Sequence, residues 1–253
     1  MKRFSRHAGV IFAMFLFFPL SAFAGWVLYD DFSSGQIDIT KWEVAGQDAA
    51  TVSVEDGAAK FVLDTDIKNK SSWLKIKQSP EKVKGIRVKV KFESRVVGVR
   101  GRIAGYVGTD PNGDHVWTQI ALQQSTNDPL TGNQFAWYGM STIDPENNYI
   151  DVKSYLYGEF PRPLAGTYPA PIDLTGEWVT LEISFNPAKF TYGLPDPDLN
   201  WYLKNYKPLT KVKKYGKDTD PDFLFKGIGV RANSGAPDGQ QCVIYFDDVY
   251  VLR

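Results

Sequence analysis

The sequence has few of the residues that disulfide, zinc or cofactor chemistry requires. Its 253 residues include one cysteine, Cys242, and two histidines, His7 and His115. A single cysteine excludes a disulfide within the chain, and so few thiol and imidazole groups exclude the common zinc sites. The sequence also contains no Gly-x-Ser-x-Gly elbow, no phosphate-binding loop and no dinucleotide-binding fingerprint.

The chain also lacks an excess of charge of one sign. Its 29 Lys and Arg residues balance 29 Asp and Glu residues, so the formal net charge is zero. This balance excludes a nucleic-acid-binding protein that is held by bulk electrostatics. The hydrophobic content of 43% excludes a highly charged disordered chain, because enough apolar surface is available for burial.

The only long hydrophobic run lies near the N-terminus. Three basic residues within the first six positions precede the apolar run 10–18, and an Ala-x-Ala site ends at Ala24. This order predicts a secretory signal peptide over residues 1–24. A membrane-spanning helix needs about 20 apolar residues, and Pro19 follows this shorter run. We therefore expect cleavage rather than a membrane anchor, and no membrane span afterwards.

We expect the mature chain, residues 25–253, to be a single domain and a monomer in the periplasm or outside the cell. It would have 229 residues and a net charge of −3. A domain of this length buries enough surface to fold without disulfides. Aromatic residues make up 14% of the chain, and it has 22 Gly and 15 Pro residues. This combination favours an all-β protein with short strands.

The strand pattern is clearest over residues 86–93, where apolar and charged residues alternate as in a half-buried strand. The turn residues 55–57 predict a hairpin between the strands 51–54 and 59–63. Further strands are expected over residues 100–107, 115–123, 135–142, 149–157, 178–185, 199–204, 225–231 and 242–252. Outside the predicted signal peptide, no apolar stretch has helical periodicity. The fold class that this pattern predicts is all-β, a two-sheet antiparallel β-sandwich.

Three segments resemble the jelly-roll domains of the concanavalin A-like lectin/glucanase superfamily, which includes LamG-like domains. Residues 30–42 (DDFSSGQIDITKW) resemble the start of many such domains, and residues 176–183 (GEWVTLEI) resemble their G-x-W-x-x-L-x-I strand. Residues 244–251 (IYFDDVYV) resemble their closing strand. The resemblance implies a jelly-roll fold. It does not select one activity, because the superfamily includes lectins, glycosidases, lyases and adhesion modules.

The resemblance also implies a structural calcium ion near the first and last strands. The corresponding ligands here would be Asp31, the backbone carbonyl of Gly57, and Asp247 or Asp248. Carboxylate and carbonyl oxygens are the ligands that Ca²⁺ prefers. The alternative is that these aspartates are solvated residues of turns and strand edges.

Strand alternation predicts a polar and aromatic face that could line a groove. Over residues 115–123 it places aromatic and polar side chains opposite aliphatic ones. Sugars require this mixture of flat ring faces and hydrogen-bonding groups. The predicted ligand-binding residues are Arg102, His115, Trp117, Gln119, Gln123, Trp137 and Tyr155. Taken singly, each tryptophan is more typical of a core residue than of a ligand-binding one, because aromatic residues dominate protein cores.

These residues predict an exported, lectin-like protein that binds a polysaccharide in an aromatic-lined groove. A glycosidase usually needs two facing carboxylates, but the chain has no Glu-x-Asp motif. The carboxylates that could reach the groove, Asp151 and Glu182, lie on different expected strands.

Two alternatives remain open. One is an enzyme, either an atypical glycoside hydrolase or a polysaccharide lyase, in which Arg102, His115, Gln119 and Tyr155 would neutralise the substrate and move protons. The other is a structural or adhesion module.

Overall fold

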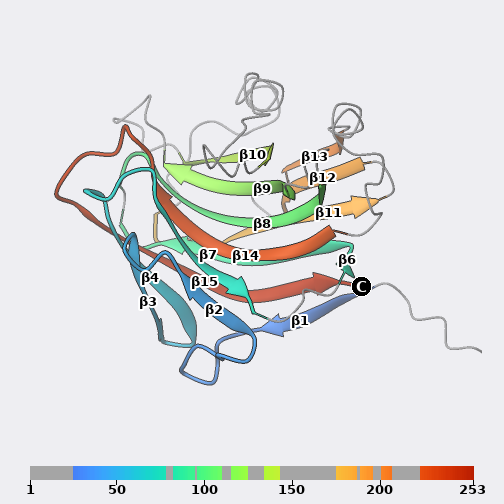
Figure 1. Cartoon of the computed structure of the whole chain (residues 1–253), viewed down its shortest axis with the longest axis horizontal. Helices are drawn as coiled ribbons and strands as arrows, with labels where there is room; N and C mark the ends of the chain where they lie inside the picture. Colours follow the sequence, from blue (N-terminus) through green and yellow to red (C-terminus); the bar gives the residue numbers. More distant parts are fainter. Residues whose placement is uncertain are drawn as a thin grey trace, which may run out of the picture.

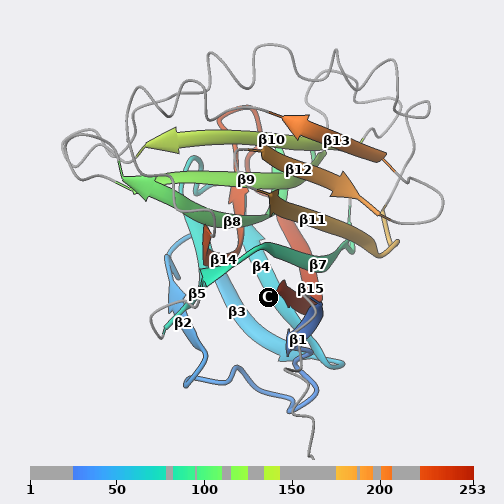
Figure 2. The same ribbon diagram turned by 90° about the vertical axis from the view of Figure 1, so that its right-hand side faces the viewer.

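The computed structural model describes residues 25–77, 82–94, 96–109, 115–124, 134–142, 175–186, 189–195, 201–206 and 223–253. These residues form fifteen β-strands in two antiparallel sheets, and within them there is no helix. The predicted two-sheet β-sandwich is confirmed. Figure 2 shows the two layers from the side, with β2 and β5 on the left and β1 and β15 on the right.

One sheet has eight strands in the order β13-β12-β11-β7-β15-β4-β3, with β1 paired to β15. The first and last strands of the described fold are therefore neighbours. Its strands are β1 (Trp26–Asp30), β3 (Ala50–Glu55), β4 (Ala58–Asp64), β7 (Gly85–Phe92), β11 (Val179–Asn186), β12 (Lys189–Leu194), β13 (Trp201–Tyr206) and β15 (Gln241–Leu252).

The other sheet has seven strands in the order β10-β9-β8-β14-β5-β2, with β6 paired to β14. Figure 1 shows β10, β9, β8 and β14 following one another from top to bottom. Its strands are β2 (Trp42–Ala45), β5 (Ser71–Ile76), β6 (Lys82–Val83), β8 (Val99–Thr109), β9 (His115–Gln124), β10 (Gln134–Thr142) and β14 (Phe223–Ala232).

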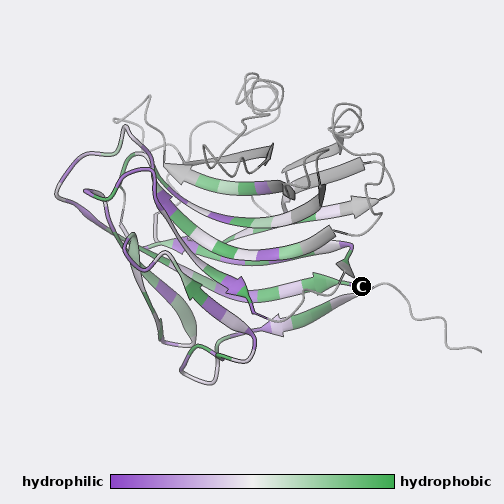
Figure 3. Ribbon diagram, in the orientation of Figure 1, coloured by the Kyte–Doolittle hydropathy of each residue, from purple (hydrophilic) through white to green (hydrophobic). Residues whose placement is uncertain are grey.

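The core lies between the two sheets and follows from the alternation of the strands. On β7, Ile86, Val88 and Val90 are fully buried, while the charged residues between them face outward. Figure 3 shows the same change between hydrophobic and hydrophilic residues along several strands. The sheets approach closely at Gly101 of β8, where a Cβ atom would lie 2.9 Å from Val90 Cγ2. Glycine at this position allows that approach.

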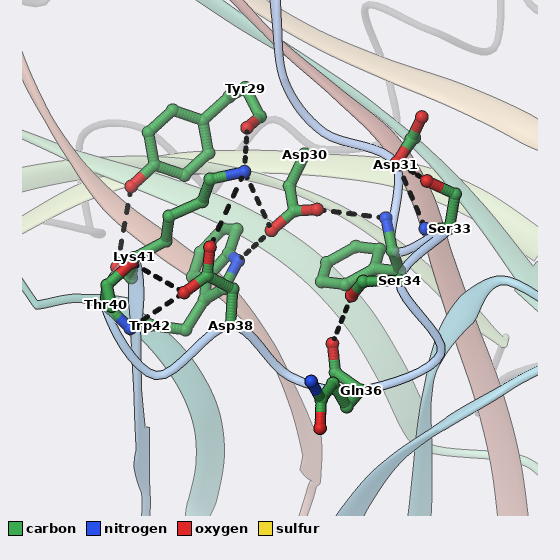
Figure 4. A network of polar contacts seen from close by, with 11 residues as sticks. Tyr29, Asp30, Asp31, Ser33, Ser34, Gln36, Asp38, Thr40, Lys41 and Trp42 are labelled. Carbon is green, nitrogen blue, oxygen red and sulfur yellow. Dashed lines mark hydrogen bonds and ion pairs between the residues drawn. The ribbon is translucent and has the colours of Figure 1, made fainter.

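A buried polar network joins β1 to β2 (Figure 4). The carboxylate of Asp30 accepts hydrogen bonds from the Trp42 indole at 2.7 Å and from the Phe32 backbone N–H at 3.0 Å. Lys41 Nζ lies 3.7 Å from the same carboxylate and donates to the Tyr29 carbonyl oxygen at 3.1 Å. The rings of Phe32 and Trp42 stack with their centroids 6.0 Å apart. This network fixes the start of the fold.

The predicted hairpin over residues 51–63 is confirmed. Glu55 pairs with Ala58, so Asp56 and Gly57 form a two-residue loop between β3 and β4. Both have positive φ values, 51° and 77°. This is the geometry of a type I′ turn, which Asp-Gly sequences favour.

Strands β2, β5, β6 and β12 of the structure were not predicted from the sequence. The expected strand over residues 149–157 lies outside the described residues, as do residues 1–24, the predicted signal peptide. In the described ranges, no helix has the length and apolar character needed to cross a membrane.

Candidate functional site

The candidate site lies on the outer face of the seven-stranded sheet, the face directed away from the core. Ile103 on β8 and Ile120 on β9 are fully buried in the core, so strand alternation places Arg102 and Gln119 on the outer face. Both of these polar side chains are buried, with exposed fractions of 2% and 0%. The structure therefore brings two predicted site residues together, as buried rather than open groups.

The side chain of Arg102 connects β8 to its neighbour β9 and, across β14, to β5. One guanidinium nitrogen, Nη1, donates to Gln119 Oε1 on β9 at 3.0 Å, and the other, Nη2, donates to Ser71 Oγ on β5 at 2.5 Å. Hydrogen bonds from a charged donor are stronger than neutral ones. They fix the direction of the guanidinium group across the sheet.

The indole ring of Trp73 on β5 is the centre of this arrangement. Arg102 Cζ lies 4.2 Å from the ring centroid, and Lys226 Nζ on β14 lies 4.7 Å from it. These distances are typical of cation–π contacts. We refer to Ser71, Trp73, Arg102, Gln119 and Lys226 as the Trp73 cluster.

Lys226 is the titratable group of the cluster. Burial, together with the positive charges of Arg102 and Lys75, lowers its pKa from 10.5 to about 7. Near neutral pH the amine is therefore present in both protonation states. It can donate hydrogen bonds to an anionic or hydroxyl oxygen when protonated, and it can accept a proton when neutral.

The other predicted ligand-binding residues are placed by backbone register. His115, Trp117 and Gln123 lie on β9, and Trp137 on β10 is paired with Ala121, which is in turn paired with Arg102. Trp137 and Arg102 therefore belong to one cross-strand row. Tyr155 lies outside the described residues.

Three residues of the Trp73 cluster were missed by the sequence reasoning: Ser71, Trp73 and Lys226. Trp73 belongs to β5, which was not predicted, because Trp73 and Leu74 are both apolar and hide the alternation of the strand. Lys226 lies beside Gly227 in a predicted strand. An isolated glycine within a strand is a signal of a β-bulge, and that signal could have drawn attention to its neighbour.

Glu182 and Trp178 lie away from the Trp73 cluster. Glu182 belongs to β11 of the eight-stranded sheet, where it accepts hydrogen bonds from Arg87 Nε at 3.0 Å and Nη2 at 2.6 Å. The expectation that Glu182 could reach the groove is therefore wrong. Trp178 directly precedes the same strand, is 37% exposed, and has Lys91 Nζ 4.9 Å from its ring centroid.

The predicted calcium ligands converge at one end of the eight-stranded sheet. β1 ends with Asp30 opposite Val249, and Phe246 pairs with Ala59, two residues after Gly57. This register brings Asp31, Gly57 and Asp247 toward the same edge of the sheet, the one formed where β1 ends and β4 begins alongside β15 rather than by an edge strand.

The two predicted aspartates of β15 differ in their electrostatic environment. Burial raises the pKa of Asp247, and the carboxylates of Asp248 and Asp31 raise it further. Asp248 forms an ion pair with Lys89 at 2.6 Å, so its charge is already compensated. Among the described residues, no three His, Cys, Asp or Glu side chains are grouped as a metal ion would require. A Ca²⁺ ion at this edge would have Asp31, Asp247 and the Gly57 carbonyl as its ligands.

Comparison with known proteins identifies the fold. No protein-family model and no curated protein matches the chain. The catalytic domain of an endo-1,3-beta-glucanase (laminarinase) from Thermotoga petrophila is similar in structure, with a TM-score of 0.50 and 12% identity over 91% of this chain and 98% of that chain. The fold is a concanavalin A-like jelly roll.

Two further solved structures cover most of both chains at lower scores. A cellulose induced protein gives a TM-score of 0.48 and 16% identity over 88% of this chain and 95% of that chain. The beta-glucanase of Bacillus licheniformis gives 0.49 and 10% identity over 90% and 97%. At these identities the jelly-roll comparison shows the fold alone, and the function has to be argued from the side chains.

Proposed function

We propose that the protein is exported and binds a polysaccharide, as a lectin-like protein, through the outer face of the seven-stranded sheet. The observation that carries this proposal is the Trp73 cluster, whose buried indole, guanidinium and amide groups adjoin on one sheet face, with the half-buried Lys226 over the indole ring. Sugar recognition needs ring contacts together with directed hydrogen-bonding groups. By register, Trp137 belongs to the cross-strand row of Arg102, and Trp117 lies two residues before Gln119 on β9.

Binding is tested by retention of the mature protein on a panel of insoluble and gel-embedded polysaccharides. We expect Trp117→Ala and Trp137→Ala to weaken retention about fivefold or more, because stacking on a sugar ring is lost. Trp178→Ala is the matched control, since this exposed tryptophan directly precedes β11 of the other sheet. Equal retention of all three variants and the wild type would show that this face is not the binding site. A structural or adhesion module would be retained by no polysaccharide.

Export is supported by the order of residues in the leader and by the pairing of the first described residue. Gly25 directly follows the predicted cleavage site, and its N–H donates to the Arg253 carbonyl oxygen at 3.2 Å. Cleavage after Ala24 would keep this contact. The mass of protein recovered from the periplasm or the medium is expected to correspond to a chain that begins at Gly25. A recovered chain that begins at Met1 would contradict the proposal.

A second candidate function is polysaccharide lyase activity at the same face. The observation that favours it is Lys226, an amine whose pKa is about 7 and which lies over Trp73 beside Arg102. In β-elimination a base takes the proton next to the sugar carboxylate, the glycosidic C–O bond breaks, a C=C bond forms, and the leaving oxygen takes up a proton. A neutral lysine can serve as that base.

Product analysis distinguishes the two functions. A lyase would raise the ultraviolet absorbance of an acidic polysaccharide as unsaturated ends form, and Lys226→Gln would abolish the rise. A hydrolase would release reducing ends without this absorbance. Retention without either product would support the lectin-like function and exclude both enzymatic activities on the polysaccharides tested.

We also propose that Ca²⁺ stabilises the edge formed by Asp31, Gly57 and Asp247. The support is the register that converges there and the mutual repulsion of the carboxylates at this edge. A bound cation would offset that repulsion and tie β1 to β15. Its role would be structural, because this edge belongs to the eight-stranded sheet and the Trp73 cluster to the other.

A further inference from the structure

A β-bulge on β14 directs Lys226 to the outer face of the seven-stranded sheet. Phe225 pairs with Gly105 and Gly227 pairs with Ala104, so Lys226 is an additional residue opposite the regular strand β8. Phe225 and Ile228 are both buried in the core, which strict alternation would not allow. A bulge of this kind re-aims a side chain. Here it brings a lysine over Trp73.

Two glycines on β14 make this arrangement possible. Gly227 has a φ of 152°, and a Cβ atom there would collide with the backbone carbonyl oxygen of Leu74. A Cβ atom at Gly229 would collide with the indole ring of Trp73. The ring therefore lies directly against the backbone of β14. The bulge and the position of the ring are both built into the backbone.

Positively charged side chains from several strands lie close to this ring. Arg102 Cζ and Lys226 Nζ lie 4.2 Å and 4.7 Å from the Trp73 centroid, and Lys75 lies on the same strand as Trp73. Both Arg102 and Lys75 repel the charge on Lys226 strongly enough to lower its pKa. Lys226 and Lys75 are half-buried, whereas Arg102 is almost fully buried. The two lysines are therefore the more accessible cations.

The neighbouring strands place further charged residues near Lys226. On β8, Arg100 lies two residues from Arg102 and pairs with Arg231 of β14. On β6, Lys82 pairs with Leu224. On β2, the exposed Glu43 pairs with Lys75. Among the residues that the structure describes on these strands, the charged neighbours are thus mainly basic, with Glu43 as the acidic residue beside Lys75.

We propose that Lys226 and Lys75 bind the anionic group, a carboxylate or a sulfate, of an acidic polysaccharide. This inference rests on the proposed polysaccharide-binding function and names the substrate class. Cations that are partly desolvated and close together repel one another, and an anion placed among them removes that repulsion. A neutral sugar offers no such compensation. The buried Arg102 contributes through its positive charge and through the hydrogen bond that orients Gln119.

The test compares three probes with wild-type and variant mature protein in affinity electrophoresis: polygalacturonate, a sulfated galactan and the neutral glucan laminarin. Wild-type protein is expected to bind one or both acidic polymers. Lys226→Gln and Lys75→Gln are expected to weaken that binding about tenfold or more, since a hydrogen bond to a charged group contributes enough for such a change. The two acidic probes distinguish a carboxylate from a sulfate ligand.

Lys91→Gln is the matched control, because Lys91 also lies over an aromatic ring, 4.9 Å from the Trp178 centroid, but on the other sheet. It is expected to change the binding less than about twofold. Equal losses in all lysine variants would mean non-specific charge attraction and would overturn the inference. Thermal unfolding of each variant checks that the fold is intact.

The remaining outcomes separate the inference from the function on which it rests. Binding of laminarin as tight as that of the acidic polymers, unchanged in Lys226→Gln, would overturn the acidic-ligand inference and leave polysaccharide binding standing. Failure of the wild-type protein to bind any probe or any polysaccharide of the wider panel would overturn both.

Discussion

The indole N–H of Trp42 donates a 2.7 Å hydrogen bond to the carboxylate of Asp30, twelve residues earlier in the chain. Asp30 is 8% exposed and Trp42 is 1% exposed. The residues that carry the resemblance at the start of the chain therefore form a structural anchor between β1 and β2. This explains why such a motif accompanies a fold rather than one activity.

We expect Asp30→Asn to destabilise the protein by about 2–4 kcal/mol. An amide nitrogen in place of one carboxylate oxygen would face either the Trp42 indole or the Phe32 N–H, which are both donors. Lys41 adds little, because its side chain is 40% exposed and solvent screens the pair. The measurement is the free energy of unfolding from urea denaturation.

Asp38→Asn is the matched control for this anchor. Asp38 Oδ1 accepts hydrogen bonds from the Thr40 backbone N–H at 2.9 Å and from its hydroxyl at 2.6 Å, in a more exposed turn. An asparagine retains one acceptor oxygen there, so the expected cost is below about 1 kcal/mol. Wild-type stability of Asp30→Asn would show that the buried hydrogen bonds are not needed.

The fold was predictable where the local pattern and the tertiary environment agree. The alternation over residues 86–93 became β7, and the Asp56-Gly57 pair became a two-residue turn, because each depends on its own segment. The strand β5 was missed because Trp73 faces outward yet is only 6% exposed. Its burial depends on Arg102 and Lys226, which belong to other strands.

The candidate site was predictable only in part, for the same reason. Arg102 and Gln119 were expected on one face, and their hydrogen bond joins adjacent strands of the sheet. The position of Lys226 depends on a bulge, and bulges move every later residue by one step along the alternation. Local sequence marks this bulge only by Gly227. The collision that excludes other residues there involves Leu74 of β5, about 150 residues earlier.

Calcium is expected to raise the melting temperature of the mature protein. At a concentration one hundred times the dissociation constant, binding contributes about 2.7 kcal/mol, which corresponds to about 5–10 °C for a domain of this size. Asp247→Asn should lose this gain. In the presence of a chelator the same variant should be at least as stable as the wild type, because one of the repelling carboxylates is gone. Differential scanning calorimetry measures both effects.

Asp238→Asn is the matched control for calcium binding, because Asp238 is 77% exposed and paired with Lys68. It should keep the full calcium-dependent gain. No change in melting temperature of the wild type between calcium and chelator would rule out the structural ion. A gain of equal size in Asp247→Asn would place the ion elsewhere.

Replacing Lys226 by methionine should stabilise the protein, and more so below about pH 7 than near pH 10. The folded-state pKa of Lys226 is about 7, against 10.5 for the ordinary group. Between these values the unfolded chain binds more protons, so wild-type stability rises with pH, and below about pH 7 the full cost of burying the charge remains. The difference between the variant and the wild type should therefore shrink as pH rises, by an amount on the order of a few kcal/mol.

Urea denaturation at about pH 6, 8 and 10 measures this difference directly. Lys91→Met, measured in parallel, reports the effect of removing a lysine that lies over an aromatic ring of the other sheet. A stability gain of Lys226→Met that is constant across the pH range would mean that Lys226 is not held in a charge-disfavouring environment.

An acidic ligand at Lys226 should also bring a proton with it. An anion beside the amine favours the charged form, so binding raises the pKa of Lys226 from about 7 toward its ordinary value. At about pH 8 the free protein carries mostly neutral amine, and each binding event should take up close to one proton. The affinity should fall as pH rises through 7 and above, because the neutral amine must first be protonated and the free-energy cost of that protonation grows with pH.

Titration calorimetry in two buffers with different ionisation enthalpies measures the uptake. Lys226→Gln should abolish the dependence of the binding enthalpy on buffer, whereas Lys91→Gln should preserve it. Tight binding of an acidic polymer with no proton uptake in the wild type would place its anionic group away from Lys226.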